Sequence, residues 1–378
     1  MSDVGVAEVV PLNGDTVREL AGVTGEPVVV SFYLDVDGRR RPRWADVEEA
    51  VEHLARRARE RAARLGVERA VERDLERIRA RLGGGLDRSA VRGLALFSCS
   101  ERGFLREIRV GRSVRDQVTV DSSPRVAQLE EALEADVPFV VVLADRQRCR
   151  IFLVRLGEAH EVSGPCDERA RAVDVDRELG GFGHYEEEAL RHHLRRCAQA
   201  LLHQIEQLPG AHVLLGGTEA TAAALERFLE PSVRRRLAGR VSLAVTATPG
   251  EVAAAAVDVG RDLEQRAEEE LVEQLRQFTA AGSGGVVGLE PTLEALEERR
   301  VATLLVSRQF SAWGGRCGSC GWVGPGVRLC PRCGTRLEEV EDVVEVALDE
   351  ALAQKATVVV CDHTDLDWFG RIGAIERY

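Results

Sequence analysis

The sequence predicts an α/β protein of three domains, in which helices flank the sheets. The chain has 378 residues, enough for about two or three domains of ordinary size. Apolar residues make up 44% and charged residues 30%, which is a globular composition. Strand-like apolar runs alternate with helical stretches along most of the chain. We expect domains at residues 1–135, 136–278 and 279–378, with mixed or mostly parallel sheets in the last two.

The first domain is predicted to be an α/β unit that carries a charged helical hairpin. The run PVVVSFYLDV (27–36) is typical of a buried strand. Two strongly charged helical stretches follow at 45–65 and 67–82, and three glycines end the second one. Strand-like runs return at 91–99 and 104–110.

A short basic loop lies between the first strand and the hairpin. It contains Arg39, Arg40, Arg41 and Arg43 around Pro42. The planar guanidinium group of arginine suits phosphate. The loop is therefore a candidate contact for a phosphate-bearing ligand, and a solvated turn is an equally good interpretation.

The middle domain is predicted to combine a hairpin with alternating strands and helices in a largely parallel sheet. In chain order the expected elements are a hairpin (137–145 and 148–156), a helix (184–208), a strand with its helix (211–217 and 218–230), and a strand with a long helix (240–248 and 250–277). Thr218 and Thr221 are candidate N-caps of the second helix.

The third domain is predicted to follow a linker, AAGSGGVVG (280–288), because the stretch is made of small residues. A helix (289–300) and a buried strand (301–307) come next, and a cluster of cysteines interrupts the pattern. Helix and strand resume through ATVVVCD (356–362) to a C-terminal RIGAIERY.

The cysteine cluster predicts a structural zinc ribbon at 315–335. Cys317, Cys320, Cys330 and Cys333 form two C-x2-C pairs with nine residues between them. Four thiolates at this spacing close a tetrahedral zinc site and leave no open position for water. An iron site or two disulfides are the alternatives.

The stretch LGGFGHYEEEALRHHLRR (179–196) combines a glycine-rich loop with an amphipathic helix. The apolar side of the helix repeats at steps of three and four. Its members are Leu190, Leu194, Cys197, Leu201, Ile205 and Leu208. The basic residues lie away from that stripe: Arg191, His192, Arg195 and Arg196. The loop before the helix consists of Gly180, Gly181, Phe182 and Gly183, followed by His184 and Tyr185.

Two chemical interpretations of this stretch are open besides a plain loop before a helix. A glycine-rich loop can cradle phosphate at a helix N-terminus, but no strand precedes it and no Walker lysine follows. His184, His192 and His193 could form an acid–base set for RNA cleavage, although no carboxylate partner can be assigned.

The net charge and the apolar runs exclude two classes of protein. A formal charge of -12 argues against sequence-indifferent coating of nucleic acid, although it is compatible with local basic tips. No apolar run is long enough to span a bilayer, and the acidic N-terminus lacks a basic signal-peptide start. We therefore expect a cytoplasmic protein without a membrane partner.

Three features in this order resemble the archaeal and eukaryotic class-I release factor and Pelota superfamily with its bacterial relatives. They are the Gly-Gly tip with its basic helix, the segment VVGLEPTLEALEERRVATLLVS (286–307), and the terminal GRIGAIERY (370–378). The resemblance covers roughly 136–378, and the cysteine insertion is compatible with archaeal members. It implies an α/β middle domain with a Gly-Gly-Gln loop and a third α/β domain with an inserted zinc ribbon.

The chain departs from the family at two functional positions. Gly180 and Gly181 fall on the family's two glycines, but Phe182 occupies the glutamine position. In release factors that tripeptide positions water at the ester between peptide and tRNA, and phenylalanine has no amide to do so. The first domain also lacks an Asn-Ile-Lys-Ser equivalent, so stop-codon-dependent termination is not expected.

The resemblance implies a factor that binds the ribosomal A site and does no chemistry of its own. We expect it to be a monomer. We expect hibernation, rescue or quality control, as in the Balon-like relatives that lack the glutamine and sit beside elongation factor Tu. Phe182 or Tyr185 would stack on an unpaired base, and the basic residues of the helix and of the loop at 39–43 would hold rRNA or tRNA phosphates. The rival hypotheses are a peptidyl-tRNA hydrolase or tRNA nuclease, and a zinc-stabilised interaction protein unrelated to translation.

Overall fold

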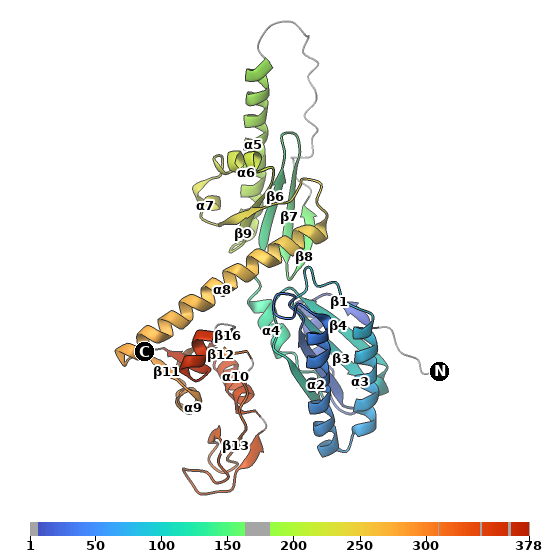
Figure 1. The fold of residues 1–378 in the computed structure, drawn as a ribbon, viewed down its shortest axis with the longest axis vertical. Coiled ribbons are helices and arrows are strands. Elements are labelled where there is room, and N and C mark those ends of the chain that lie inside the picture. The colour runs from blue at the N-terminus through green and yellow to red at the C-terminus, as the bar shows by residue number, and fades with distance from the viewer. Residues whose placement is uncertain (1–6, 163–181, 309, 341, 362–363, 378) are drawn as a thin grey trace. The chain divides into compact units, whose positions relative to one another are not determined.

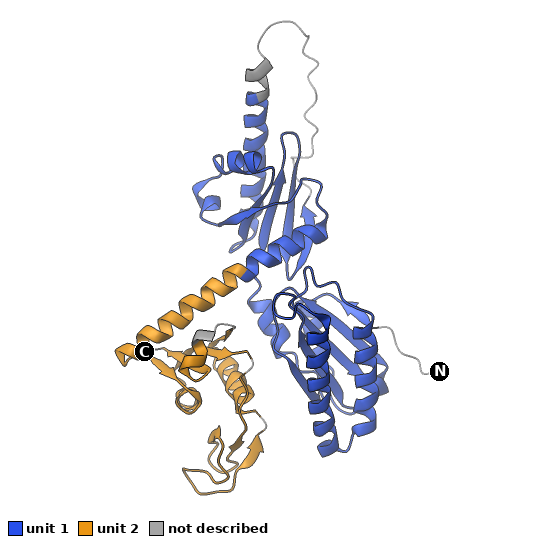
Figure 2. Cartoon of the chain, in the orientation of Figure 1, with its two compact units in different colours: residues 1–261 blue, residues 262–378 orange. Residues whose placement is uncertain are grey.

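The computed structural model describes residues 7–162, 182–308, 310–340, 342–361 and 364–377 (Figure 1). The chain divides into two compact units, Met1–Arg261 and Asp262–Tyr378 (Figure 2). Each of the three predicted domains contains one main sheet, so the predicted mixed α/β architecture with several sheets is confirmed. Among the described helices, none combines the length and the apolarity that a bilayer crossing requires.

The first sheet has the strand order β1-β4-β3-β2-β5. Its strands are β1 (Glu8–Val10), β2 (Val29–Asp35), β3 (Gly93–Cys99), β4 (Phe104–Val110) and β5 (Gln117–Asp121). Only the β1–β4 pair is parallel. One core contains α2 (Trp44–Leu65) and α3 (Glu68–Gly83), and a second contains α1 (Gly14–Ala21) and α4 (Ala127–Glu134).

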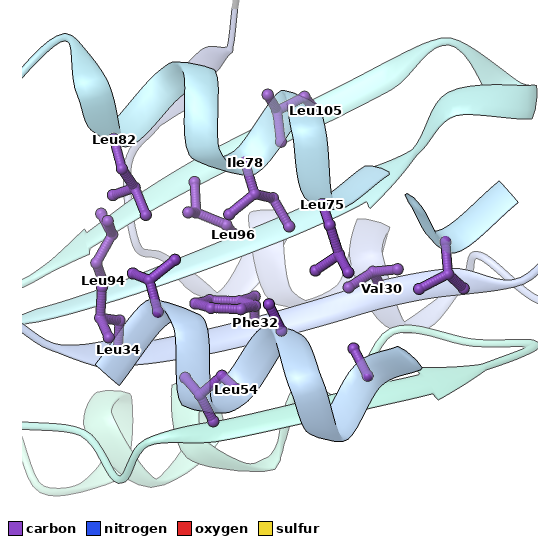
Figure 3. Close-up of a cluster of buried hydrophobic side chains, with 14 of the residues drawn as sticks. Val30, Phe32, Leu34, Leu54, Leu75, Ile78, Leu82, Leu94, Leu96 and Leu105 are labelled. Carbon is purple, nitrogen blue, oxygen red and sulfur yellow. The ribbon is translucent and has the colours of Figure 1, made fainter. Parts of the chain in front are cut away.

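The predicted charged hairpin is confirmed as α2 and α3, and its buried stripe explains why it folds. Leu54 of α2 and Leu75 and Ile78 of α3 meet Phe32 and Leu96 of the sheet (Figure 3). All five side chains are at most 1% exposed. Apolar residues at helical spacing thus hold the hairpin against the sheet. Asp74 of α3 is buried with them and accepts a hydrogen bond from the Ser98 hydroxyl.

The second sheet has the order β10-β9-β6-β7-β8. Its strands are β6 (Phe139–Ala144), β7 (Cys149–Arg155), β8 (Glu158–Val162), β9 (His212–Gly217) and β10 (Leu237–Val241). The predicted β6–β7 hairpin is confirmed, and β9 and β10 pair parallel with β6 and β9, respectively. The sheet is therefore mixed. Three helices accompany it: α5 (Phe182–Gln207), α6 (Glu219–Glu226) and α7 (Pro231–Arg234).

Two predictions for this part of the chain are wrong in their bounds. The strand expected at 240–248 is β10, which ends at Val241, so most of that apolar run is not a strand. The helix expected at 218–230 ends at Glu226, and Pro231 begins the separate helix α7 because proline suits a first helical turn. Thr218 is the N-cap of α6, whereas Thr221 donates its backbone amide to that cap from inside the helix.

The third sheet has the order β11-β17-β12-β16. Its strands are β11 (Gly285–Val287), β12 (Val301–Ser307), β16 (Thr357–Cys361) and β17 (Ile372–Glu376). The long α8 (Pro249–Ala281) precedes it, and α9 (Leu289–Glu297) and α10 (Val343–Ala353) pack into its core. The linker expected at 280–288 is wrong in part, because Val286 and Val287 form β11 and pair with the C-terminal strand β17.

The first and second sheets belong to one compact unit because a hairpin turn joins them. Leu156, in the turn between β7 and β8, packs against the core that contains α1 and α4. A Cβ on Gly111 would lie 2.8 Å from the backbone of Gly157, and a Cβ on Gly157 would lie 2.9 Å from the carbonyl oxygen of Ala90. Neither glycine can therefore be replaced without movement. The domain boundaries expected after residues 135 and 278 stay predictions.

A buried ion cluster makes a second connection within the same unit. Asp37, after β2, is fully buried, and its carboxylate lies 3.0 Å from Nε of Arg92 and 3.1 Å from Nε of Arg261 on α8. Burial alone would raise the pKa of Asp37, but a hydrogen bond from the Arg39 amide and the charges of Arg261 and Arg92 lower it below its usual value. The carboxylate is therefore ionised at neutral pH and balances buried guanidinium groups.

We expect Asp37→Asn to lower the free energy of unfolding by about 3–5 kcal/mol at pH 7, because it leaves two guanidinium groups without their shared counter-charge. Since the pKa of Asp37 is depressed in the folded state, its contribution is lost as the pH falls below about 4. Urea denaturation of the wild type and the variant, at pH 7 and below pH ~4, measures the difference in their free energies of unfolding. Asp15→Asn, in an exposed pair with Arg18, is the control and should cost about 0–1 kcal/mol. Equal costs for both variants would contradict the prediction.

Candidate functional site

The four clustered cysteines converge on one point. Cys317, Cys320, Cys330 and Cys333 place their Sγ atoms within 4.8 Å of one another. Sγ of Cys317 lies 3.5 Å from that of Cys333, and the Cys320–Cys330 separation is also 3.5 Å. Four thiolates around a tetrahedral zinc would be separated by about 3.8 Å, as follows from Zn–S bonds of about 2.3 Å. The cluster can therefore hold a metal ion.

The local backbone explains why both cysteine pairs point inward. The amide of Gly321 donates to the carbonyl of Cys317, and the amide of Gly334 donates to the carbonyl of Cys330, each at 2.9 Å. Each C-x2-C pair is thus folded into the same tight turn. Hydrogen bonds with the Thr335 side chain and backbone lower the pKa of Cys333 to about 6, which favours its thiolate. A backbone hydrogen bond from Trp322 lowers the pKa of Cys320, but hydrogen bonds with the other cluster cysteines raise that pKa to about 12, so the four thiols share protons as one group.

A small three-stranded sheet carries the cluster. Its order is β14-β13-β15, with β13 (Gly314–Arg316), β14 (Val323–Pro325) and β15 (Glu338–Val340). The Trp322 indole packs with Cys317, Cys330 and Leu337. A Cβ on Gly324 would lie 2.3 Å from the indole ring, so only glycine leaves room for it. With four protein ligands and an indole cover, the arrangement suits a structural metal rather than a catalytic one.

The second candidate site surrounds the start of α5, and part of it lies outside the described residues. Gly180 and Gly181 belong to that part. Phe182 and Gly183, which were expected in the loop, are already helical, so the helix is described from two residues earlier than predicted. The side chains of Phe182, His184 and Tyr185 also lie outside the described residues. Phe182, which the sequence analysis assigns to the family's glutamine position, is therefore the first described residue of α5.

The predicted apolar stripe of α5 is confirmed, and it fixes the direction of the basic side chains. Leu194, Cys197, Leu201 and Ile205 are at most 3% exposed, in a core with β6 and β9. The basic face consists of Arg191, His192, Arg195 and Arg196. The first three side chains are exposed, and Arg196 is partly buried.

Contacts within the protein orient the arginine side chains of this face. The Arg191 guanidinium donates to Glu187 at 2.9 Å, as an exposed pair one helical turn apart. Arg195 lies over the ring of Phe228 at 5.6 Å, a cation–π contact that orients it. His193, half-buried, approaches the carbonyl oxygen of Arg148 at 3.3 Å. The face can therefore offer further guanidinium hydrogen bonds to an anion.

The basic loop at 39–43 has a structural use that the sequence did not reveal. Arg40 donates to Asp35 at 2.7 Å, and Arg41 donates to Asp116; both arginine side chains are at most 25% exposed. Arg39 and Arg43 are more exposed, at 52% and 80%, and contact Asp258 and Asp46. The carboxylate partners are distant in sequence for Arg41 and Arg39, so no local signal could have shown the pairing.

The second sheet and α5 lie in a segment that matches a known protein family. Residues 124–261 match the family model described as bacterial archaeo-eukaryotic release factor family 10. The match covers the whole second sheet and α5.

The likeness to this family of bacterial release-factor-like proteins is therefore shown for residues 124–261.

Three of the solved structures to which the chain is similar differ in the extent of the match. Archaeoglobus fulgidus Pelota is 14% identical, with 76% of this chain and 79% of that chain covered and a TM-score of 0.40. The C-terminal domain of the peptide chain release factor from Methanosarcina mazei is 27% identical, with 36% and 98% covered and a TM-score of 0.28. A model of ribosome-bound archaeal Pelota and ABCE1 is 15% identical, with 99% and 95% covered and a TM-score of 0.44. A search of curated proteins found no match.

The metal centre yields a direct prediction. We expect the purified chain to carry one metal ion per molecule, and Cys320→Ser/Cys333→Ser to carry none, because two of four ligands are lost. Elemental mass spectrometry measures the stoichiometry. Buried Cys361→Ser, outside the cluster, is the control and should keep the metal. A metal-free protein with oxidised cluster cysteines would contradict the assignment.

Proposed function

We propose that the chain is a translation factor that binds the ribosomal A site and does not hydrolyse peptidyl-tRNA. It would act in hibernation, rescue or quality control. The observation that carries the proposal is the family match over 124–261. To it we add the sequence interpretation that Phe182 stands at the position of the catalytic glutamine. The family supplies the ribosomal setting, and the substitution removes the amide that would orient the attacking water.

The build of α5 supports a role as an arm that reaches into a narrow site. Among its described side chains, Leu190 is the first that packs against the core, so residues 182–189 extend past the core contacts for about 12 Å at the usual helical rise. Figure 1 shows α5 projecting beyond the sheet that contains β6, β7 and β9. An arm fixed at one end can carry a glycine-rich tip into a crowded RNA cavity at little conformational cost.

The charges support a local and salt-sensitive contact with RNA. The chain as a whole carries a net charge of -12, so a phosphate backbone is repelled from most of the surface. Arg191, Arg195 and Arg196, with His192, concentrate positive charge on one helix face. Contacts of this kind release counterions, and affinity then falls steeply with salt. Phe182 would stack on an unpaired base at the end of the arm.

The remaining predicted contacts involve the loop at 39–43, the third domain and the cysteine cluster. In the loop at 39–43, Arg39 and Arg43 remain the better candidates for a second RNA contact, since Arg40 and Arg41 are held by Asp35 and Asp116. The third domain would contact a translational GTPase such as elongation factor Tu, as the family resemblance implies. The metal of the cysteine cluster would be zinc in a purely structural role.

The hydrolase and nuclease alternatives gain no support from the described residues. A general acid–base histidine needs a partner that sets its tautomer and proton affinity. His192 makes no hydrogen bond to a carboxylate in the described part of the chain, and four cysteine ligands leave a metal no open position. Hydrolysis would therefore have to come from groups other than these.

Co-sedimentation with 70S ribosomes tests the binding proposal. We expect the chain to pellet with 70S at low salt and to be released at moderate salt, because the contact is electrostatic. Phe182→Ala and Arg195→Ala/Arg196→Ala should weaken pelleting about tenfold or more, through lost stacking and phosphate contacts. Arg240→Ala is the control, since Arg240 is paired with Glu219 and Glu226. Wild-type chain that stays in the supernatant, with and without elongation factor Tu, would refute the proposal.

A peptide-release assay tests the absence of chemistry. We expect the wild-type chain to leave peptidyl-tRNA intact on the ribosome, because phenylalanine has no amide to position water. Phe182→Gln is the informative variant, since with Gly180 and Gly181 it restores the family's Gly-Gly-Gln tripeptide. Measured release of labelled peptide by the wild type, above the rate with buffer alone, would show that the chain is a hydrolase.

A further inference from the structure

We propose that the cysteine ribbon carries a docking surface for an acidic protein surface within the ribosome-bound assembly. The surface, called the ribbon patch, consists of Trp313, Val327, Arg328, Leu329 and Arg336. The proposal rests on the proposed function only for the setting in which the partner is met. It concerns a face of the molecule that the RNA contact of α5 does not use.

Exposed apolar side chains are concentrated on this ribbon. Trp313 is 46% exposed, Val327 39% and Leu329 61%. In the described part of the chain only four other large apolar side chains are comparably exposed, and they lie on other elements: Val9, Leu65, Val137 and Trp368. Single exposed apolar residues need no explanation, but several on one small sheet point to an interaction site.

Backbone hydrogen bonds show that the segments that carry the ribbon patch are neighbours. The amide of Gly326 donates to the carbonyl of Trp313 at 3.2 Å, which places the start of the loop 326–329 against Trp313. Leu329 pairs with Arg336 in an antiparallel bridge, so these two side chains are neighbours. The amide of Leu337 donates to the carbonyl of Arg328 at 2.9 Å and closes the same ladder. The backbone at Trp313, the loop and the second cysteine turn are therefore adjacent.

The charges on the patch indicate the kind of partner. Arg328 and Arg336 are exposed, and neither is paired with a carboxylate within the described residues. By contrast, Arg332 on the same ribbon is paired with Glu297 of α9. Two unneutralised guanidinium groups beside an apolar cluster are complementary to a surface that combines apolar side chains with carboxylates.

The apolar members of the patch favour a protein over RNA. A guanidinium group and an indole suit RNA as well as protein, but Val327 and Leu329 offer nothing to a phosphate backbone. Their burial releases free energy only against other apolar groups. Tryptophan and arginine around a small aliphatic centre is also the composition of protein–protein hot spots. Rigid presentation by the cysteine cluster lowers the entropic cost of docking.

Site-specific photo-crosslinking tests the proposal. The photoreactive residue p-benzoylphenylalanine replaces Leu329 in the full-length chain, which is bound to purified 70S ribosomes with and without elongation factor Tu. Co-sedimentation of this variant is measured first, because it reports on the proposed function independently of the ribbon patch. We expect irradiation to join position 329 to one protein of the assembly, through a face rich in Asp and Glu. The same photoreactive residue at exposed Val9, on β1, should not give that product.

Charge reversal separates the ribbon patch from the rest of the ribbon. Arg328→Glu/Arg336→Glu should lower the crosslink yield about tenfold, which corresponds to about 1.4 kcal/mol of lost attraction. Arg316→Glu is the matched control, because Arg316 is equally exposed but lies at the other end of β13 from Trp313, opposite Glu338. Three outcomes would each overturn the inference while leaving the proposed function standing. They are crosslinks to rRNA, crosslinks whose yield the charge reversal does not change, and no crosslink on ribosomes that do bind the chain. A chain that binds no ribosomes would remove both.

Discussion

The burial of one stripe of α5 against the second sheet is the contact on which the proposed function depends. Leu194, Cys197 and Leu201 lie in a core with β6 and β9, Leu190 packs at the margin of that core, and residues 187–189 before it are exposed. The helix is therefore fixed at one end and presents its basic face and N-terminal tip at a set distance from the sheet. Loss of that stripe would leave the same tip residues with no defined direction, whatever their affinity for RNA.

Contacts between the first and second sheets extend this constraint to the first domain. The turn that contains Leu156 packs into one core of the first domain. The carboxylate of Asp37, in the first domain, forms an ion pair with Arg261 of α8. The basic loop at 39–43 is thus held in the same compact unit as α5. An ion pair with Asp258 ties Arg39 to α8 as well. We infer that a ribosome would meet both basic regions on one body rather than on two independent ones.

Sequence reasoning succeeded where the signal was local and periodic. The α2–α3 hairpin, the β6–β7 hairpin and the stripe of α5 follow from apolar spacing, and the cysteine cluster follows from two C-x2-C pairs. It failed where a distant partner decided the outcome. The small-residue stretch at 280–288 becomes β11 only because β17 lies beside it, and Arg41 is a structural residue only because Asp116 is near. The ribbon patch also went unnoticed, since exposure cannot be read from composition.

Occupancy of the A site is the central claim, and competition with tRNA tests it most directly. Ribosomes with a filled P site are titrated with the chain while a fluorescent aminoacyl-tRNA occupies the A site. The account predicts mutual exclusion: the chain displaces the A-site tRNA, and excess tRNA prevents binding of the chain. Simultaneous binding of both to one ribosome would place the chain elsewhere and contradict the account.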